Sequence, residues 1–341
     1  MDLTTKYLGL TLRNPIIASA SPLTGDVATI RQLEDAGAAA VVLPSLFEEQ
    51  ICAEQRLTEA LIEVGSESSP EAGSYFPASI AYNAGPGGYL DLIARARAAV
   101  DIPVIASLNG STEAGWVDYA KLMEDAGASA LELNIYRIAS GPAVTGAEVE
   151  ADCVALVGAV RCQVKIPLAV KLHPHFSAFG ALARYLDHAG ADGLVLFNRL
   201  YQPDIDLVRL GWRNDLALSS ASEIRLGLLW LSELSGQLTH ASLAASTGVE
   251  GADEVVKYLL AGADVVMTTS ALLRHGPGCL KTRLDDLSTW LSARGFPSVS
   301  AIRGLMRRGD PESEARERGD YILALMNYRT QPAVPVSRAS L

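Results

Sequence analysis

A lysine interrupts one of the apolar runs of this sequence. Lys171 stands inside LAVKL, residues 168–172, where a packed core would normally place an aliphatic side chain. An ammonium group in such a run must pair with a buried carboxylate or face an anionic ligand, because an unpaired buried charge is too costly to keep. Glu132, in the run ALELN at residues 130–134, is the candidate partner. Both interpretations hold together if Glu132 orients Lys171 toward a ligand.

Polar residues also stand near the carboxyl ends of the other apolar runs. Glu132 and Asn134 lie two residues apart, so in a strand both side chains point to the same face. One polar residue inside a sheet or barrel means little, but a set of them at one end indicates a site. The set comprises Ser19, Ser45, Asn109, Asn134, Lys171, Asn198, Ser246, Thr247, Thr268 and Thr269.

Two loops in the last third of the chain combine glycine and hydroxyl residues. Thr247 and Gly248 open a loop that leads into a helix-like stretch, and the hydroxyl run at residues 268–270 precedes another. Backbone N–H groups at the starts of helices, together with hydroxyl groups, form anion sites, although hydroxyl residues are also common helix caps. The pairing of these two loops predicts a phosphate-binding site.

Eight short apolar runs carry these residues, and a helix-like segment rich in Ala, Leu and Glu accompanies each of them. Runs that are apolar on both faces and alternate with helices are typical of parallel strands. Four of the helix-like segments end in Ala-Gly, the pattern of a helix that stops at a left-handed glycine. The count predicts an α/β protein of the (β/α)8 TIM-barrel class rather than a doubly wound sheet. The runs begin at residues 15, 39, 103, 130, 168, 193, 242 and 264.

Two long stretches break this rhythm, about residues 46–91 after the second run and residues 199–240 after the sixth. Both follow the carboxyl end of a predicted strand, which is the face where barrel enzymes build their sites. We interpret them as insertions that cover the site. The expected domain organisation is a single barrel over residues 1–310 followed by a C-terminal helical tail at residues 311–341.

Composition argues against several classes of function. The formal net charge is −11 and no basic cluster is longer than MRRG, which argues against nucleic acid or a membrane surface as partner. The four cysteines lie far apart, and His173 and His175 lack nearby paired acids, so neither a disulfide framework nor a metal site is expected. No dinucleotide-binding or P-loop glycine motif is present. The N-terminal residues lack a leader pattern, which predicts a cytoplasmic protein.

The chain resembles the dihydroorotate dehydrogenase family of flavin-dependent (β/α)8 barrels from about residue 3 to residue 300. The motifs YLGLTLRNPIIASAS, ELNI, VKLHP, GLVLFN, STGVEGADEVVKYLLAGADVV and TTSALLRHGP occur in the family's order. The resemblance implies a bound FMN, with Lys171 near the N1 and O2 atoms of the flavin, where a cation favours the anionic reduced form.

The resemblance also assigns roles to the polar residues at the strand ends. It implies that Thr247, Gly248, Thr268, Thr269 and Ser270 hold the FMN phosphate. It implies that flavin or substrate contacts Asn109, Asn134 and Asn198, and the cofactor-binding candidates further include Ser19, Ser45, Ser219 and Ser220.

Several positions depart from the family pattern. After ELN the family places a segment such as Ser-Cys-Pro-Asn that presents the catalytic base, whereas this chain reads YRIA at residues 136–139. The family's lysine at the end of the second strand is absent from LPS at residues 43–45. Asn83 is kept, but the second asparagine of its segment is a glycine, and Ser219-Ser220 and Thr247-Gly248 stand where the family has glycine pairs. The flavin site is therefore predicted to be kept and the orotate site to be changed.

We predict an FMN-dependent oxidoreductase that acts on the CH–CH group of a small anionic substrate and is a poor dihydroorotate dehydrogenase. Lys171 and Arg137 are the candidate catalytic residues, and Arg137 could hold a carboxylate through two hydrogen bonds. The substrate-binding candidates are Asn83, Asn134, Tyr136, Arg137 and Asn198, and the candidate replacement bases are Cys52, Tyr82, Tyr136, Ser140, His173 and His175.

Two other functions stay open at this point. A flavin-binding protein with little turnover, in a binding or regulatory role, would explain the missing base. A flavin-free lyase or isomerase could use Lys171 as a Schiff-base nucleophile. The family resemblance further implies a homodimer and a role in pyrimidine metabolism, and an electron-acceptor protein would be a further partner.

Overall fold

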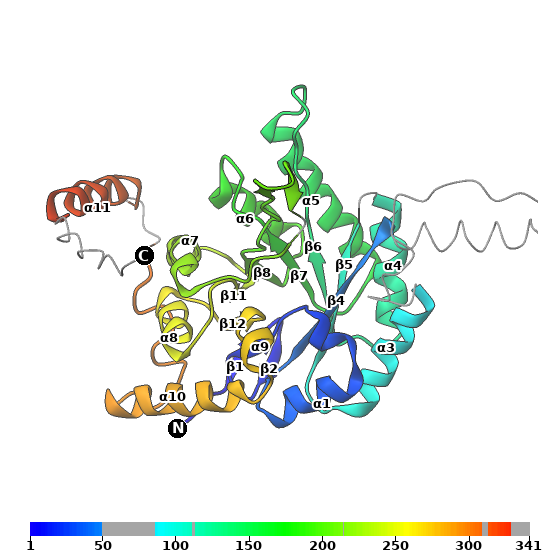
Figure 1. The fold of residues 1–341 in the computed structure, drawn as a ribbon, viewed down its shortest axis with the longest axis horizontal. Coiled ribbons are helices and arrows are strands. Elements are labelled where there is room, and N and C mark those ends of the chain that lie inside the picture. The colour runs from blue at the N-terminus through cyan, green and yellow to red at the C-terminus, as the bar shows by residue number, and fades with distance from the viewer. Residues whose placement is uncertain (50–85, 111–112, 214, 309–312, 329–341) are drawn as a thin grey trace, which may run out of the picture.

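The computed structural model describes residues 1–49, 86–110, 113–213, 215–308 and 313–328. Eight parallel strands close into a barrel (Figure 1), in the order β11-β12-β3-β4-β5-β6-β7-β8. Each predicted apolar run contains one of these strands, so the predicted (β/α)8 barrel is confirmed. The strands are β3 (Ile16–Ala18), β4 (Val41–Phe47), β5 (Val104–Asn109), β6 (Ala130–Asn134), β7 (Leu168–Leu172), β8 (Gly193–Leu196), β11 (Ser242–Ala245) and β12 (Val265–Thr268).

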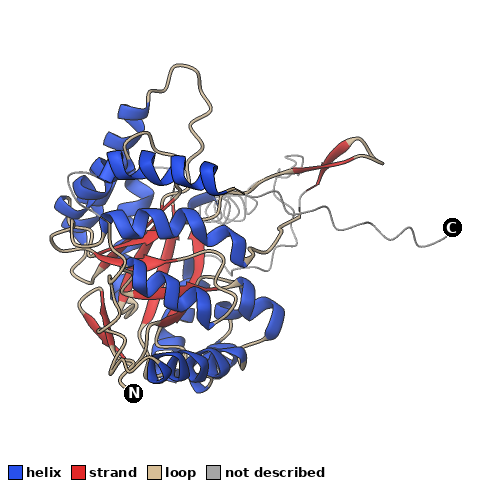
Figure 2. Ribbon diagram, turned by 90° about the vertical axis from the view of Figure 1, so that its left-hand side faces the viewer, coloured by secondary structure: helices blue, strands red, loops and turns tan. Residues whose placement is uncertain are grey.

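Helices surround the barrel (Figures 1 and 2) and pack on the outward faces of the strands. The four predicted Ala-Gly helix endings are confirmed, because Gly37, Gly127, Gly190 and Gly262 all have positive φ angles. The helices are α1 (Val27–Asp35), α3 (Pro86–Ala99), α4 (Glu113–Asp125), α5 (Gly146–Gln163), α6 (Phe179–His188), α7 (Ile224–Leu234), α8 (Ala252–Ala261), α9 (Ser270–His275), α10 (Cys279–Ala293) and α11 (Ser313–Asn327), with short 3-10 turns η1 (Pro22–Gly25) and η2 (Ala221–Glu223).

Alternation along each strand separates two hydrophobic cores. In β5, Val104, Ala106 and Leu108 belong to the core between strands and helices, whereas Ile105 belongs to the core inside the barrel. A hairpin of β1 (Thr5–Tyr7) and β2 (Leu10–Leu12) contributes Tyr7 and Leu8 to the inner core. Both side chains pack against Gly193 at the start of β8, so the hairpin closes the N-terminal end of the barrel. The opposite end of the barrel, at the carboxyl ends of the strands, carries the polar side chains.

The two stretches predicted to be insertions contain, in part, helices of the barrel itself. Residues 50–85 lie outside the described residues, but α3 begins at Pro86, inside the range 46–91. Residues 199–240 contain an antiparallel hairpin, β9 (Asp204–Asp206) and β10 (Gly211–Arg213), which projects from the barrel in Figure 2. The same range contains α7, which packs between α6 and α8 as a barrel helix. The division into a barrel at 1–310 and a helical tail at 311–341 stays a prediction.

None of the helices in the described part of the chain is long and apolar enough to cross a membrane.

Candidate functional site

Lys171 and Glu132 form a buried ion pair inside the barrel, near the carboxyl ends of their neighbouring strands. The Lys171 Nζ atom lies 3.3 Å from Glu132 Oε1 and 3.2 Å from Ser19 Oγ. The lysine side chain is 9% exposed and the glutamate side chain 1%. Lys171 also lines a cavity at the mouth of the barrel. The two interpretations of Lys171 therefore coexist, because the ammonium group has a carboxylate behind it and a cavity in front of it.

The charge beneath this cavity is incompletely satisfied. Glu132 Oε2 and the Tyr7 hydroxyl are buried and have no hydrogen-bond partner among the described residues. Burial, followed by the nearby Glu132 carboxylate, raises the pKa of Tyr7 well above its usual value, so its hydroxyl stays protonated. Because Glu132 Oε2 has no partner among the described residues, the ion pair with Lys171 is the main contact of this buried carboxylate.

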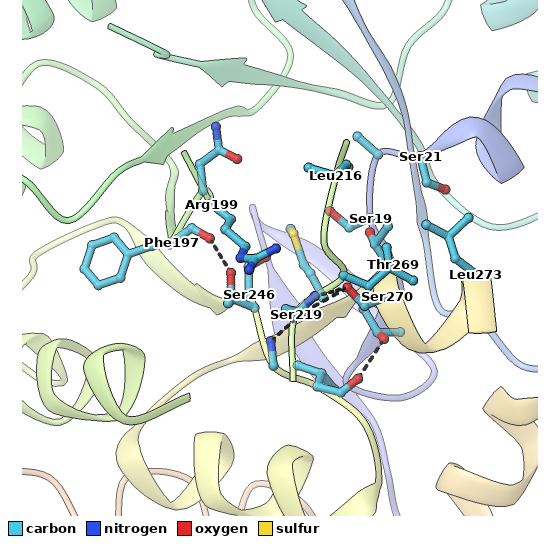
Figure 3. Close-up of a pocket in the computed structure, with 18 of the residues that line it drawn as sticks. Ser19, Ser21, Phe197, Arg199, Leu216, Ser219, Ser246, Thr269, Ser270 and Leu273 are labelled. Atoms are coloured by element: carbon cyan, nitrogen blue, oxygen red, sulfur yellow. Dashed lines mark hydrogen bonds between the residues drawn. The ribbon is translucent and has the colours of Figure 1, made fainter. Parts of the chain in front are cut away.

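The cavity has a volume of about 260 Å³ and lies among the loops that follow β3, β8, β11 and β12 (Figure 3). This is close to the lower end of the roughly 300–1,000 Å³ typical of ligand sites. No aspartate or glutamate belongs to its described lining, whereas the cations Lys171 and Arg199 do. Each of these cations also has a carboxylate partner behind the wall, so the cavity surface itself presents cations and no carboxylate, which suits an anionic ligand. The predicted cofactor-binding residues that line it are Ser19, Lys171, Asn198, Ser219, Thr247, Gly248, Thr268, Thr269 and Ser270.

Hydroxyl groups gather at one end of the cavity. Ser219 Oγ lies 2.8 Å from Ser270 Oγ and accepts a hydrogen bond from the Gly248 N–H at 3.2 Å. Gly248 has a φ of +73°, and a Cβ atom there would lie 2.7 Å from Ile224 and 2.8 Å from the Ser220 carbonyl oxygen. Only glycine fits this close approach without strain. Three separate segments therefore meet in one polar surface, and two of them are the loops from which the sequence predicted a phosphate site.

The other predicted cofactor residues do not line the cavity. Ser45 Oγ bonds Ser107 Oγ at 2.7 Å inside the barrel, and Asn109 is buried at the end of β5. Asn134 lies one step from the cavity, because its Oδ1 atom accepts a 2.7 Å hydrogen bond from Asn198 Nδ2. The backbone N–H of Ser220 donates to Glu223 and caps η2. Asn83 lies outside the described residues.

Tyr136 and Arg137 are held by protein groups rather than by the cavity. The Tyr136 hydroxyl accepts a hydrogen bond from the backbone N–H of Tyr201 at 2.9 Å. Arg137 Nη1 lies 2.6 Å from Asp152 Oδ2 in an exposed ion pair with α5. Neither residue is part of the cavity lining. A substrate carboxylate at Arg137 would share the guanidinium group with Asp152.

Arg199 is the cavity cation that sequence reasoning missed. Its Nε atom lies 2.9 Å from Glu223 Oε2, and its Nη1 group donates to the Ala217 carbonyl oxygen. Its position directly after Asn198, at the end of β8, could have identified it as a site residue. The neighbouring apolar wall, Phe197 and Leu216–Leu218, was missed as well.

The described candidate bases lie outside the lining. Burial lowers the pKa of His173, and its Nδ1 atom accepts a 3.1 Å hydrogen bond from the His175 backbone N–H. A neutral His173 ring therefore carries its proton on Nε2, where it is a donor rather than a proton acceptor. Tyr136, Ser140 and His175 are also absent from the lining. Cys52 and Tyr82 lie outside the described residues.

Within the described ranges, no group of three or more His, Cys, Asp or Glu residues could hold a metal ion.

The fold and the site together define a (β/α)8 barrel with a polar cavity at the carboxyl ends of its strands, where enzymes of this architecture carry their active sites. The family model described as dihydroorotate dehydrogenase matches residues 81–291. The chain belongs to the dihydroorotate dehydrogenase family. Membership implies an oxidoreductase that works with a flavin.

Individual relatives agree with this assignment. The chain is 33% identical over 216 residues to a protein of Aeropyrum pernix named "Putative dihydroorotate dehydrogenase A (fumarate)", covering 61% of this chain and 68% of that protein. It is 28% identical over 211 residues to the dihydroorotate dehydrogenase B (NAD(+)) catalytic subunit of Shouchella clausii, covering 60% and 68%. Its identity to the subunit of the same name from Thermoplasma volcanium is 25% over 312 residues, covering 89% and 98%.

Proposed function

We propose that the protein is an FMN-dependent oxidoreductase that acts on the CH–CH group of a small anionic substrate. The observation that carries the proposal is the cavity, which has Lys171 in its wall and the Ser219, Gly248 and Ser270 cluster at its hydroxyl-rich end. Bound FMN would supply a two-electron acceptor at the mouth of the barrel. Lys171 would lie against the flavin ring, and the hydroxyl cluster would hold the phosphate.

The residues present fit this cofactor. The hydroxyl cluster offers hydrogen-bonding groups to phosphate oxygens, and Gly248, where a Cβ atom would meet Ile224 and the Ser220 carbonyl, lets the loop after β11 pack against Ser219. The absence of carboxylates from the described lining removes the repulsion that a phosphate would meet. The Lys171 ammonium, backed by Glu132, is placed to stabilise negative charge on the ring.

FMN, rather than FAD, should be the flavin that the purified protein carries. The Ser219, Gly248 and Ser270 cluster is the proposed seat of one phosphate, and the sequence has no dinucleotide-binding glycine motif. Heating the protein, followed by chromatography of the supernatant, should release one FMN per chain. Recovery of FAD, or failure to bind any flavin on reconstitution of the protein, would overturn the proposed function.

The substrate side of the site stays a proposal. Asn198 lines the cavity and bonds Asn134, so this amide pair is the part of the proposed substrate site that reaches the cavity. Asn83, Tyr136 and Arg137 complete the proposed set. A small anion would meet the same cationic side chains, Lys171 and Arg199, and no carboxylate in the described lining.

A flavin-binding protein with little turnover is the second candidate function. It is favoured by one observation, namely that none of the described candidate bases lines the cavity. The lyase or isomerase alternative has less support, because the ion pair with Glu132 favours an ammonium group, whereas a Schiff-base nucleophile must be a neutral amine.

A homodimer is also part of the proposal, and the β9–β10 hairpin supports it. Leu207, Val208 and Leu210 at the tip are 82%, 93% and 84% exposed, and Trp212 is 70% exposed. An isolated two-stranded hairpin with such a surface is marginally stable in water, so a second copy of the chain is the proposed cover. The cytoplasmic location, the electron-acceptor partner and the role in pyrimidine metabolism stay predictions.

Replacing Leu207 and Val208 together with glutamate should convert the dimer into a monomer. The two carboxylates would lie where apolar side chains are proposed to be buried between copies, and burying them unpaired is costly. Size-exclusion chromatography with light scattering measures the change. Tyr185→Glu, an exposed change on α6, is the matched control and should leave the mass unaltered. A monomeric wild-type protein, or a dimer that survives the double change, would contradict the proposed interface.

A further inference from the structure

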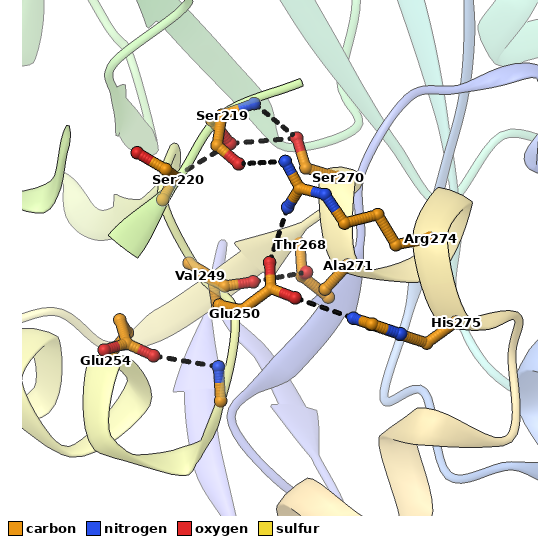
Figure 4. A network of polar contacts seen from close by, with 12 residues as sticks. Ser219, Ser220, Val249, Glu250, Glu254, Thr268, Ser270, Ala271, Arg274 and His275 are labelled. Atoms are coloured by element: carbon orange, nitrogen blue, oxygen red, sulfur yellow. Dashed lines mark hydrogen bonds and ion pairs between the residues drawn. The ribbon is translucent and has the colours of Figure 1, made fainter. Parts of the chain in front are cut away.

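Arg274, in α9, joins two of the segments that form the hydroxyl-rich end of the cavity (Figure 4). Its Nη2 group donates to the Ser219 carbonyl oxygen at 2.8 Å, and its Nη1 group lies 2.6 Å from Glu250 Oε2. Ser219 lies between the β9–β10 hairpin and η2, whereas Glu250 lies in the loop that follows β11. One guanidinium group therefore ties these two segments to the helix that follows β12.

Two further residues, His275 and Arg283, contact Glu250. His275 Nε2 lies 2.7 Å from Glu250 Oε1, so both carboxylate oxygens have partners. Arg283 Nε donates to the backbone carbonyl oxygen of Glu250 at 2.8 Å and is itself buried. Burial acts to raise the pKa of Glu250, but the hydrogen bond from His275 and the charge of Arg274 outweigh it and lower the pKa. The carboxylate is thus charged near neutral pH and anchors Arg274.

The contact with Ser219 gives this cluster its effect on the cavity. Ser219 receives Arg274 at its carbonyl oxygen, while its N–H donates to Ser270 Oγ at 3.1 Å and its hydroxyl bonds Ser270 and Gly248. Arg274 is absent from the cavity lining, but Ser219, Gly248 and Ser270 belong to it. Any influence of Arg274 on a ligand is therefore exerted through the residues that it fixes.

The charges of the cluster also favour an anion at this end of the cavity. Two guanidinium groups, Arg274 and Arg283, contact one residue, Glu250, and a single carboxylate cannot neutralise both. Of the two, Arg274 contacts Ser219 directly, so its positive charge lies behind Ser219 and favours an anion in front of it. The cluster therefore combines fixed geometry with a favourable charge at the end of the cavity where Ser219 and Ser270 bond each other.

We propose that Arg274, anchored by Glu250, is a positioning residue that makes the cavity select a phosphorylated flavin over an unphosphorylated one. This inference rests on the proposed FMN function and goes beyond it, because it assigns the selectivity to a residue outside the cavity. Without Arg274, the Ser219 carbonyl loses its charged donor and Ser219 can turn away from Ser270. The ring contacts near Lys171 would be unaffected.

The test compares FMN with riboflavin, which differs only by the phosphate group. Apoprotein is titrated with each flavin and binding is followed by quenching of flavin fluorescence. Arg274→Met should weaken FMN binding about tenfold or more and riboflavin binding less than about threefold, as expected for loss of a charge-assisted contact. Arg308→Met, an exposed arginine paired with Glu317 and Asp320, is the matched control and should change neither affinity.

Two milder variants keep the test decisive if Arg274→Met fails to fold, which thermal melting of the apoprotein would show. Arg274→Lys keeps the charge but cannot bridge two acceptors as a guanidinium does, and Glu250→Gln keeps the shape but removes the anchor charge. Both should lower the preference for FMN over riboflavin by a smaller factor. An unchanged preference in all folded variants overturns the inference alone. A wild-type protein that binds neither flavin overturns the proposed function and the inference together.

Discussion

Replacing Lys171 with alanine is expected to lower the midpoint potential of the bound flavin. The Lys171 side chain is 9% exposed and lines the cavity, so its ammonium group would stabilise the negative charge that a bound flavin ring carries only after reduction. Its loss should destabilise the reduced form more than the oxidised form. A drop of about 60 mV, equivalent to about 2.8 kcal/mol for a two-electron couple, is the expected scale. Spectroelectrochemistry of the purified holoprotein measures it directly.

Glu132 and Lys121 supply the comparison variants for this measurement. Glu132→Gln removes the negative partner 3.3 Å from Lys171 Nζ and should shift the potential in the opposite direction, upward. Lys121→Ala removes an exposed lysine on α4 that pairs with Glu124 and Asp125, and it should leave the potential unchanged. If neither Lys171→Ala nor Glu132→Gln moves the potential in a protein that still binds flavin, the ion pair serves only the structure of the barrel.

The barrel could be predicted from the sequence because its signals are local. Each strand is a short apolar run, and each of four helices ends where a glycine takes up a positive φ angle. The burial of Lys171 beside Glu132 was also predictable, since two charges in neighbouring apolar strands have few alternatives to pairing. Such features depend on residues within one or two adjacent elements.

Features that depend on distant partners could not be predicted in the same way. Arg137 pairs with Asp152, fifteen positions along the chain, and Arg199 pairs with Glu223, so Arg199 rather than Arg137 joins Lys171 as a cation of the cavity. The β9–β10 hairpin was missed because charged residues interrupt its short apolar runs. Ser219 and Ser220 look alike in sequence, but only Ser219 faces the cavity, since Ser220 caps η2.

The second large effect expected is a failure to oxidise dihydroorotate at the rate of a true dihydroorotate dehydrogenase. Dihydroorotate loses two hydrogens in this reaction, and one of them leaves as a proton that a positioned base must accept. Such a base typically contributes 10²- to 10⁴-fold to the rate. Arg137 cannot accept this proton, because a guanidinium group stays protonated near neutral pH. His173 presents a donor at Nε2, and the Tyr136 hydroxyl is occupied by the Tyr201 N–H.

The measurement is anaerobic mixing of the oxidised holoprotein with dihydroorotate while the bleaching of the flavin is followed. Bleaching should be slower by about 10²- to 10⁴-fold than in the Shouchella clausii relative measured in parallel. Reduction of the flavin by dithionite is the control, because it shows that the cofactor itself is competent. Rapid bleaching at millimolar dihydroorotate or below would refute the prediction. It would then restore the plain assignment as a dihydroorotate dehydrogenase.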